Sequence, residues 1–255
     1  MGTPGAINAH EMPDHTSGDT SESVSPIMSD PLPGGALSKN VEGMKVTPAD
    51  DGFGKLWRKR YWIRLTGSPV TPAVLIETWR THYTDFWPEG SRLYQSPGGL
   101  EEGDVVAADL MMIGGLRIGT GIVVIEEDEM SFTLGSLQGH TFCGTITFTG
   151  RNDNGATIAD VEAVFRASDP LYEIGLALGG HWYENRFWKA TLVALARHFE
   201  VDSHPEMAME CIDTQRKWRN ATNIIHNALL HTVAYLVARY IRRLVQWVKR
   251  RGRTV

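Results

Sequence analysis

Between residues 54 and 201, short runs of alternating apolar and polar residues are separated by turn residues. A period of two is typical of strands that bury one face. The predicted strands cover residues 56–66, 91–95, 105–113, 117–126, 130–137, 141–149 and 156–167. The links between the last five are short and rich in Gly, Asn, Asp or Glu, which predicts hairpins and therefore antiparallel neighbours.

Two helices interrupt this pattern. Thr71 and Pro72 predict the N-cap and first turn of a helix that runs to about Asp85. Ser168-Asp169-Pro170 predicts the start of a second, long helix over residues 171–199, which Gly179-Gly180 should weaken or bend. Its predicted buried stripe is Leu171, Ile174, Leu178, Trp182, Trp188, Leu192, Leu195 and Phe199.

The order of these elements predicts the fold class. One strand, one helix, about six more strands and a long aromatic-rich helix form an α+β domain in which a curved antiparallel sheet wraps around the last helix. The predicted inward faces carry His140, Phe142, Gly144, Ile146 and Phe148 on one strand, and Ala159, Val161, Ala163 and Phe165 on the next. We expect an apolar pocket between sheet and helix.

The ends of the chain differ from this middle part. Residues 1–50 are rich in Pro, Gly, Ser, Asp and Thr, which predicts a disordered tail without a secretory signal. Residues 205–251 are expected to form one or two helices with an apolar stripe and a polar face. Polar interruptions make a membrane-spanning segment improbable.

Charge separates the two ends further. The net charge is −5 over the whole chain and −5 over residues 1–55, but +7 over residues 204–255. An anionic partner is expected for the basic end. The residues predicted to contact a membrane are Arg239, Arg242, Arg243, Trp247, Lys249 and Arg250. Packing of residues 222–250 on the domain or on a second copy is an equal alternative, whereas the continuous apolar stripe disfavours nucleic acid.

The element order, with stretches such as Phe132-Thr133-Leu134-Gly135 and Val164-Phe165-Arg166-Ala167, resembles the START-like or SRPBCC superfamily. This superfamily has the helix-grip fold and includes birch-pollen allergen proteins, lipid-transfer START domains and polyketide cyclase/dehydrase proteins. The resemblance covers roughly residues 54–201 and implies a cavity for lipids, sterols or polyketides. We thus expect a disordered tail (1–53), a START-like ligand-binding domain (54–201) and a basic amphipathic helical extension (205–255), which departs from the family pattern.

Six residues are predicted to bind the ligand: Tyr83, Asp109, His140, Phe142, His181 and Trp182. His140 could donate a hydrogen bond to a ligand carbonyl, or be a strand-end histidine in water. An inward Asp109 would have a raised pKa and could act as acid or base, whereas an outward Asp109 would pair with Arg or Thr. His181 could line a portal or cap the core. Tyr83 could lie at the cavity rim or serve packing.

No cofactor and no metal site are predicted. Cys143 and Cys211 lack a CxxC or His-rich context, and Cys143 lies on a Thr-rich outer face, so reduced thiols in a cytoplasmic protein are the simplest interpretation. Three functions remain open. The first is binding or transfer of a hydrophobic molecule, with peripheral membrane contact. The second is a cyclase or dehydratase that uses pocket residues such as His140, Asp109 and Tyr83. The third is an interaction protein whose pocket is filled by side chains.

Overall fold

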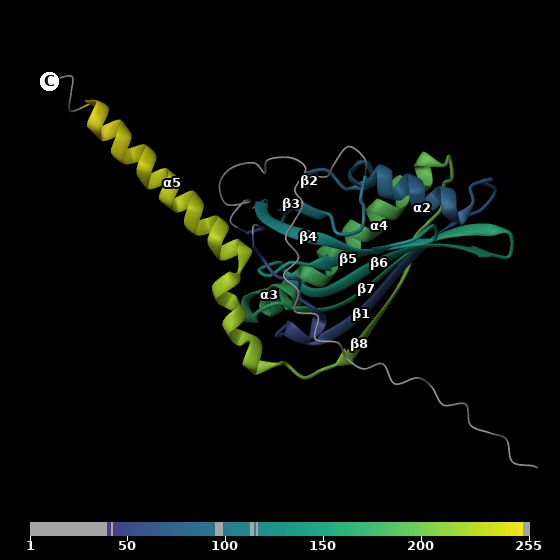
Figure 1. Cartoon of the computed structure of the whole chain (residues 1–255), viewed down its shortest axis with the longest axis horizontal. Helices are drawn as coiled ribbons and strands as arrows, with labels where there is room; N and C mark the ends of the chain where they lie inside the picture. Colours follow the sequence, from purple (N-terminus) through teal and green to yellow (C-terminus); the bar gives the residue numbers. More distant parts are fainter. Residues whose placement is uncertain (1–39, 42, 95–98, 113–114, 116, 252–255) are drawn as a thin grey trace, which may run out of the picture.

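A computed structural model describes residues 40–251 apart from 42, 95–98, 113, 114 and 116; within α5 the side chains of 248–251 are also excluded. Eight strands form one antiparallel sheet in the order β2-β3-β4-β5-β6-β7-β1-β8 (Figure 1). The strands are β1 (Leu56–Leu65), β2 (Arg92–Tyr94), β3 (Val105–Met111), β4 (Arg117–Glu127), β5 (Ser131–Ser136), β6 (Phe142–Asp153), β7 (Ala156–Ala167) and β8 (Glu206–Asp213).

Helices cover one face of this sheet. They are α2 (Pro72–Thr81), the short η2 (Tyr83–Phe86), α3 (Pro170–Gly175), the π-helical turn η3 (Leu176–Gly180) and α4 (His181–His198). Thr71 caps α2 by accepting a hydrogen bond from the backbone N–H of Val74, and Asp169 caps α3. Figure 1 shows α4 lying across the curved sheet. The predicted α+β helix-grip fold is therefore confirmed, with eight strands instead of about seven.

The main core lies between α4, α2 and the sheet. The alternate residues Tyr61, Ile63 and Leu65 of β1 are buried there, together with Leu192 and Leu195 of α4. β1 pairs antiparallel with β7 over nine residues, so the first strand of the chain lies beside the last strand of the meander. Burial of alternate residues on each strand against one helix layer is what the period of two predicts.

The long helix differs from the prediction in its first half. Ile174, Leu178 and Trp182 were expected in the buried stripe, but they are 57%, 79% and 62% exposed. Gly179 has φ 126° and Leu178 has ψ 16°, so the helix is interrupted at the predicted bend. The π-helical turn rotates the face that precedes it, and Tyr172 and Leu176 are buried instead. The stripe holds only from Trp188 onward.

The predicted extension also needs correction. Residues 206–213, expected in a helix, form β8, which pairs antiparallel with β1. Pro205 ends the preceding connection, and the backbone of β1 would otherwise present an unpaired edge. The first strand of the predicted extension, β8, therefore belongs to the same sheet as the predicted domain. The predicted boundary after residue 201 separates two parts of one fold.

The predicted N-terminal tail, residues 1–53, falls into two parts. Residues 1–39 of the expected disordered tail lie outside the described residues. From residue 40 the chain packs on the outer face of the sheet, where Val41 and Val46 contact the cluster formed with Ala107, Val123 and Leu137. This apolar outer face needs a cover, so residues 40–53 belong to the folded domain.

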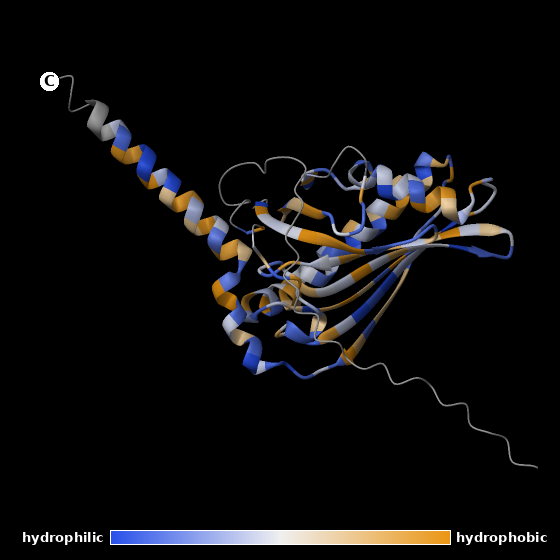
Figure 2. Cartoon of the chain, in the orientation of Figure 1, coloured by the Kyte–Doolittle hydropathy of each residue, from blue (hydrophilic) through white to orange (hydrophobic). Residues whose placement is uncertain are grey.

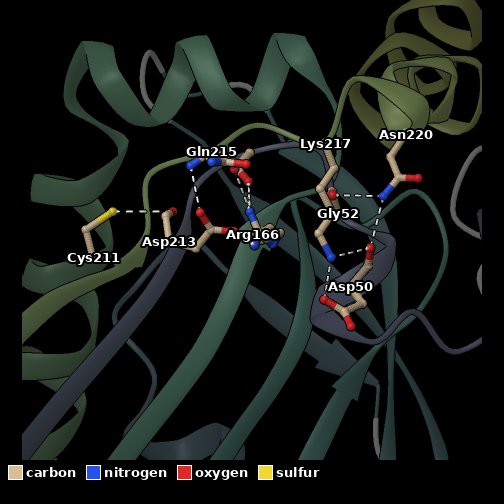
Figure 3. Close-up of polar contacts among 9 residues, drawn as sticks. Asp50, Gly52, Arg166, Cys211, Asp213, Gln215, Lys217 and Asn220 are labelled. Carbon is tan, nitrogen blue, oxygen red and sulfur yellow. Dashed lines mark hydrogen bonds and ion pairs between the residues drawn. The ribbon is translucent and has the colours of Figure 1, made fainter.

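After β8 the chain forms η4 (Trp218–His226) and then α5 (Ala228–Arg251), which extends from the body (Figure 1). Side chains tie this segment to the domain (Figure 3). The buried Arg166 guanidinium donates to the backbone oxygens of Gly54 (2.7 Å) and Gln215 (2.9 Å) and to the Asp213 carboxylate. Asn220 donates to the backbone oxygens of Asp50 and Gly52, both at 3.0 Å.

The base of α5 is thus fixed on the body although most of the helix is free of it. Among the described residues, no helix is long and apolar enough to cross a bilayer.

Candidate functional site

A cavity of about 340 Å³ lies between α4 and the sheet, within the range typical of small-molecule pockets. Its lining comes from β3, β4, β5, β6 and β7, from the α3–α4 region, and from Leu229 at the base of α5. The cavity lies between two clusters of the core, one around Tyr83 and Phe148 and one around Phe165 and Tyr172. The predicted apolar pocket is therefore present and is not filled by side chains.

Eight Phe, Trp and Tyr side chains contribute to the walls of the cavity. Tyr83 contacts Trp87 and Phe132 edge-on, with ring centroids 5.5 and 5.9 Å apart. Phe142 packs on Phe165 at 4.4 Å. The aromatic lining residues are Tyr83, Trp87, Phe142, Phe165, Tyr172, Tyr183, Phe187 and Trp188. Such a surface favours apolar or aromatic ligands.

His140 also lines the cavity, at the end of the loop that precedes β6. The backbone N–H of Phe142 donates to its Nδ1 at 3.1 Å. Burial lowers the pKa of His140 to about 4, so the ring is neutral near pH 7. Since Nδ1 accepts, the proton of the neutral ring resides on Nε2, which makes His140 a hydrogen-bond donor.

Glu184 is the one charged side chain among the described residues that line the cavity. It comes from α4, and its Oε2 accepts a hydrogen bond of 2.6 Å from Nζ of Lys59, which is fully buried on β1. Lys59 Nζ also donates to Asn185 Oδ1 at 3.0 Å. Burial raises the pKa of Glu184 and lowers that of Lys59, while the opposite charge of each partner counteracts both shifts.

Sequence reasoning missed this ion pair, although the signal was present. Lys59 has the same parity as Tyr61 and Ile63, so it is the charged residue on the inward face of its strand. Glu184 lies four residues before Trp188, which places it on the buried stripe of α4. A charge on each of two facing apolar surfaces predicts a buried pair.

The predicted site residues have different positions. Tyr83, His140 and Phe142 line the cavity. Asp109 does not, because Ala108 and Leu110 point inward and the residue between them points outward. Its carboxylate lies 3.8 Å from the Arg117 guanidinium, which matches the alternative of an outward Asp109 paired with an arginine.

His181 and Trp182 lie outside the lining. The His181 ring packs edge-on against Trp57 at 4.7 Å, and burial lowers the pKa of His181 to about 4, with smaller contributions from Lys59 and Lys55. Trp182 is exposed, and the Arg186 guanidinium lies 5.7 Å from its ring. Both residues follow the break at Gly179, and neither lines the cavity as predicted.

The base of α5 forms part of the cavity end. Leu229 lines the cavity, and its backbone N–H donates to the hydroxyl of Tyr172 at 3.1 Å. The backbone N–H of Ala228 donates to Gly139 O at 3.1 Å. Cavity and α5 are therefore in direct contact.

Most of the rest of α5 is exposed, although Thr232 is buried, and Figure 2 shows both apolar and polar residues along the helix. Arg239, Arg242, Arg243 and Trp247 are exposed, whereas Lys249 and Arg250 lie in the helix but outside the described side chains. The exposed apolar residues are Leu230, Val233, Leu236, Val237, Tyr240, Ile241, Leu244 and Val245. The sequence has no acidic residue after Asp213, and the Lys and Arg residues of α5 all lie from Arg239 onward, so the far part of the helix is basic.

The free thiols lie outside this site. Cys143 is buried, and burial raises its pKa to about 11, which keeps the thiol protonated. Within residues 40–251 as described, no group of three His, Cys, Asp or Glu side chains is placed to hold a metal ion. The cavity can therefore supply mainly apolar contacts, with the neutral imidazole of His140, the carboxylate of Glu184 and the hydroxyl groups of several Ser, Thr and Tyr lining residues as its polar groups.

Comparison with known proteins gives a family match without an assigned role. Residues 73–190 match the family described as "Domain of unknown function (DUF1990)". No curated protein matches the chain.

Solved structures are similar only at low identity. Protein Ms6760 from Mycobacterium smegmatis is 10% identical, with a TM-score of 0.40, over 55% of this chain and 89% of that chain. Major latex-like protein 151 from Panax ginseng is 13% identical, with a TM-score of 0.36, over 56% and 97%. The di-domain ARO/CYC protein StfQ from the steffimycin biosynthetic pathway is 9% identical, with a TM-score of 0.45, over 60% and 52%.

The fold assignment rests on the chain's own topology. A meander of antiparallel strands follows α2, and the long helix α4 comes after its last strand. β1 pairs with that last strand, β7. The chain thus has the helix-grip fold, and residues 73–190, which match DUF1990, form the central part of it.

Proposed function

We propose that this protein binds a hydrophobic small molecule in the cavity between α4 and the sheet, and that α5 docks the protein on an anionic membrane from which such molecules are taken. The observation that carries the proposal is the aromatic cavity of about 340 Å³, one residue of whose lining, Leu229, belongs to α5. The cavity and the helix proposed to dock on the membrane are therefore in direct contact.

Apolar contact supplies the affinity for the ligand. Burial of apolar surface contributes roughly 25 cal/mol per Å², so a ligand enclosed by Tyr83, Phe142 and Phe187 needs few polar contacts. The Nε2–H of His140 can orient a ligand oxygen. Tyr83, His140 and Phe142 are therefore the ligand-binding residues in this proposal, and Asp109, His181 and Trp182 are not.

The chemistry of α5 selects its partner. The helix has 24 residues and is therefore about 36 Å long. Its exposed apolar residues can enter the headgroup boundary while Arg239, Arg242 and Arg243 contact anionic lipid, each contributing about 1 kcal/mol near such a surface. A second copy would bring together two helices whose Lys and Arg residues, all from Arg239 onward, have no acidic counterpart in either helix, and the repulsion between them disfavours this pairing.

The ligand arm can be tested with a neutral naphthalene fluorophore, such as a methoxynaphthalene, titrated into the purified protein. The buried Ala163 lines the cavity, so Ala163→Leu should partly fill it and weaken binding at least tenfold. Ala208→Leu on the exposed face of β8 is the matched control and should leave binding unchanged. Binding that is absent, or equally strong in Ala163→Leu, would contradict the proposal.

A further inference from the structure

The contacts of Glu184 indicate which functional group a ligand of this cavity carries. Glu184 is buried yet lines the cavity, and its hydrogen bond to Lys59 uses Oε2. Among the described residues, no side chain or backbone group donates to Oε1. Oε1 is not among the described side-chain atoms that are fully enclosed without a partner, so it keeps accessible surface at the cavity, where a ligand or water can donate to it.

We infer that the cavity selects a neutral, mainly apolar molecule that carries a hydroxyl group, and that Glu184 accepts the hydrogen bond of this hydroxyl. The inference rests on the proposed function and names the ligand class for the same cavity. Lys59 is a positioning residue here, because it holds the carboxylate without itself lining the cavity.

The charge balance of the cavity excludes charged ligands. A ligand carboxylate would lie beside the Glu184 carboxylate in an apolar space, and His140 is neutral and gives no compensating charge. A ligand ammonium would meet a carboxylate already neutralised by Lys59 at 2.6 Å. A neutral hydroxyl donates its proton to Oε1 without disturbing the pair, and its oxygen can still accept another hydrogen bond.

The position of the pair explains why it persists. A buried ion pair is often no more stable than apolar residues of the same volume, so its retention calls for another reason. Glu184 and Lys59 connect α4 to β1 beneath the cavity, and the Tyr61 hydroxyl adds a bond of 2.7 Å to Asn185 Oδ1. These contacts fix the carboxylate at one point of a mainly apolar wall, in which it is the one charged group among the described lining residues.

Three probes with one carbon skeleton test the inference: a naphthol, its methyl ether and the corresponding naphthoate. In the unmodified protein the naphthol should bind about tenfold or more tightly than the ether, as expected for a hydrogen bond to a charged group. The naphthoate should bind most weakly.

The variant Lys59→Met/Glu184→Leu replaces the pair by apolar residues of similar volume and avoids leaving one charge buried alone. It should bind the ether as the unmodified protein does and lose the preference for the naphthol. Glu184→Gln should reduce that preference, and Glu206→Gln on the exposed edge of the sheet should leave it unchanged.

The outcomes separate the two claims. Equal binding of naphthol and ether by the unmodified protein, or tightest binding of the naphthoate, would overturn the inference and leave the proposed function standing. A preference that survives in the double variant would also overturn it. Failure of all three probes to bind would count against the proposed function itself.

Discussion

Asn227 and Asp169 join the first turns of two helices through one buried hydrogen bond, in which Asn227 Nδ2 donates to Asp169 Oδ2 at 2.6 Å. The other oxygen of Asp169 accepts from the backbone N–H groups of Leu171 and Tyr172 and caps α3. Oδ1 of Asn227 accepts from the N–H of Leu230 and caps α5. The pair therefore couples α5 to the helix that precedes the kink, beside the cavity.

Replacing Asn227 by Ala should destabilise the protein by about 1–3 kcal/mol, because α5 loses its cap and a buried carboxylate oxygen loses its donor. The free energy of unfolding in urea measures this. Gln246→Ala removes an exposed amide from the same helix and should change the free energy by less than about 0.5 kcal/mol. Equal effects of the two substitutions would show that the Asn227–Asp169 hydrogen bond contributes no more to stability than an exposed amide.

Gly139→Ala should loosen the base of α5. Gly139 has φ 89°, and an added Cβ would lie 2.3 Å from the backbone oxygen of His226. Gly155→Ala is the matched control, since Gly155 has φ 79° and open space around the added atom. Both variants carry the strain of a left-handed backbone, roughly 1 kcal/mol.

The difference between the two glycine variants therefore isolates the clash. Amide hydrogen exchange at residues 226–231 should accelerate in Gly139→Ala and stay unchanged in Gly155→Ala. Unchanged exchange in both variants would mean that the base of α5 tolerates displacement of this loop.

Stability should fall as pH decreases from about 6.5 to 4. The pKa of His140 is lowered to about 4 in the folded protein, while an unfolded histidine titrates near 6.5. The unfolded state thus binds more protons in this window, so the contribution of the neutral ring is fully present above pH 6.5 and is lost toward pH 4. The loss is on the order of a few kcal/mol, and the lowered pKa of His181 acts in the same direction.

Urea unfolding at a series of pH values tests this titration. His140→Gln should flatten the dependence between pH 6.5 and 4, whereas His204→Gln, at an exposed position, should leave it unaltered. A dependence as steep in His140→Gln as in the unmodified protein would contradict a partly buried His140 that is neutral near pH 7.

Reversing charge on α5 should abolish membrane docking. Arg242→Glu/Arg243→Glu should reduce binding to phosphatidylserine-containing vesicles at least tenfold, and raised salt should weaken binding by the unmodified protein. Arg92→Glu/Arg197→Glu changes the net charge equally at exposed positions outside α5 and should bind as the unmodified protein does. Co-sedimentation measures both. A dimer held by α5, insensitive to salt and without vesicle binding, would favour the second-copy alternative.

The sequence predicted the fold well where local signals agree with tertiary packing. The caps at Thr71 and Asp169 and the alternating strands follow from side-chain chemistry and period, so their elements appear where expected. The stripe through Ile174 and Leu178 failed because one π-helical turn changes which face is buried, and such a turn has no periodic signature.

β8 was missed because its pairing with β1 is long-range, and residues 206–213 show no clean alternation of apolar and polar residues. In the site, the inward positions of His140 and Phe142 were predictable from the alternation of residues along their strand. The Lys59–Glu184 pair follows from parity only when two elements are considered together, since each charge by itself is an exception on an apolar face.

The central claim is that the cavity holds a hydrophobic molecule, and native mass spectrometry of the protein purified from its host tests it most directly. The account predicts a one-to-one adduct, extractable into organic solvent as a neutral apolar compound and depleted in Ala163→Leu but not in Ala208→Leu. A protein that emerges without an adduct and takes up no apolar compound from a lipid extract would contradict the claim.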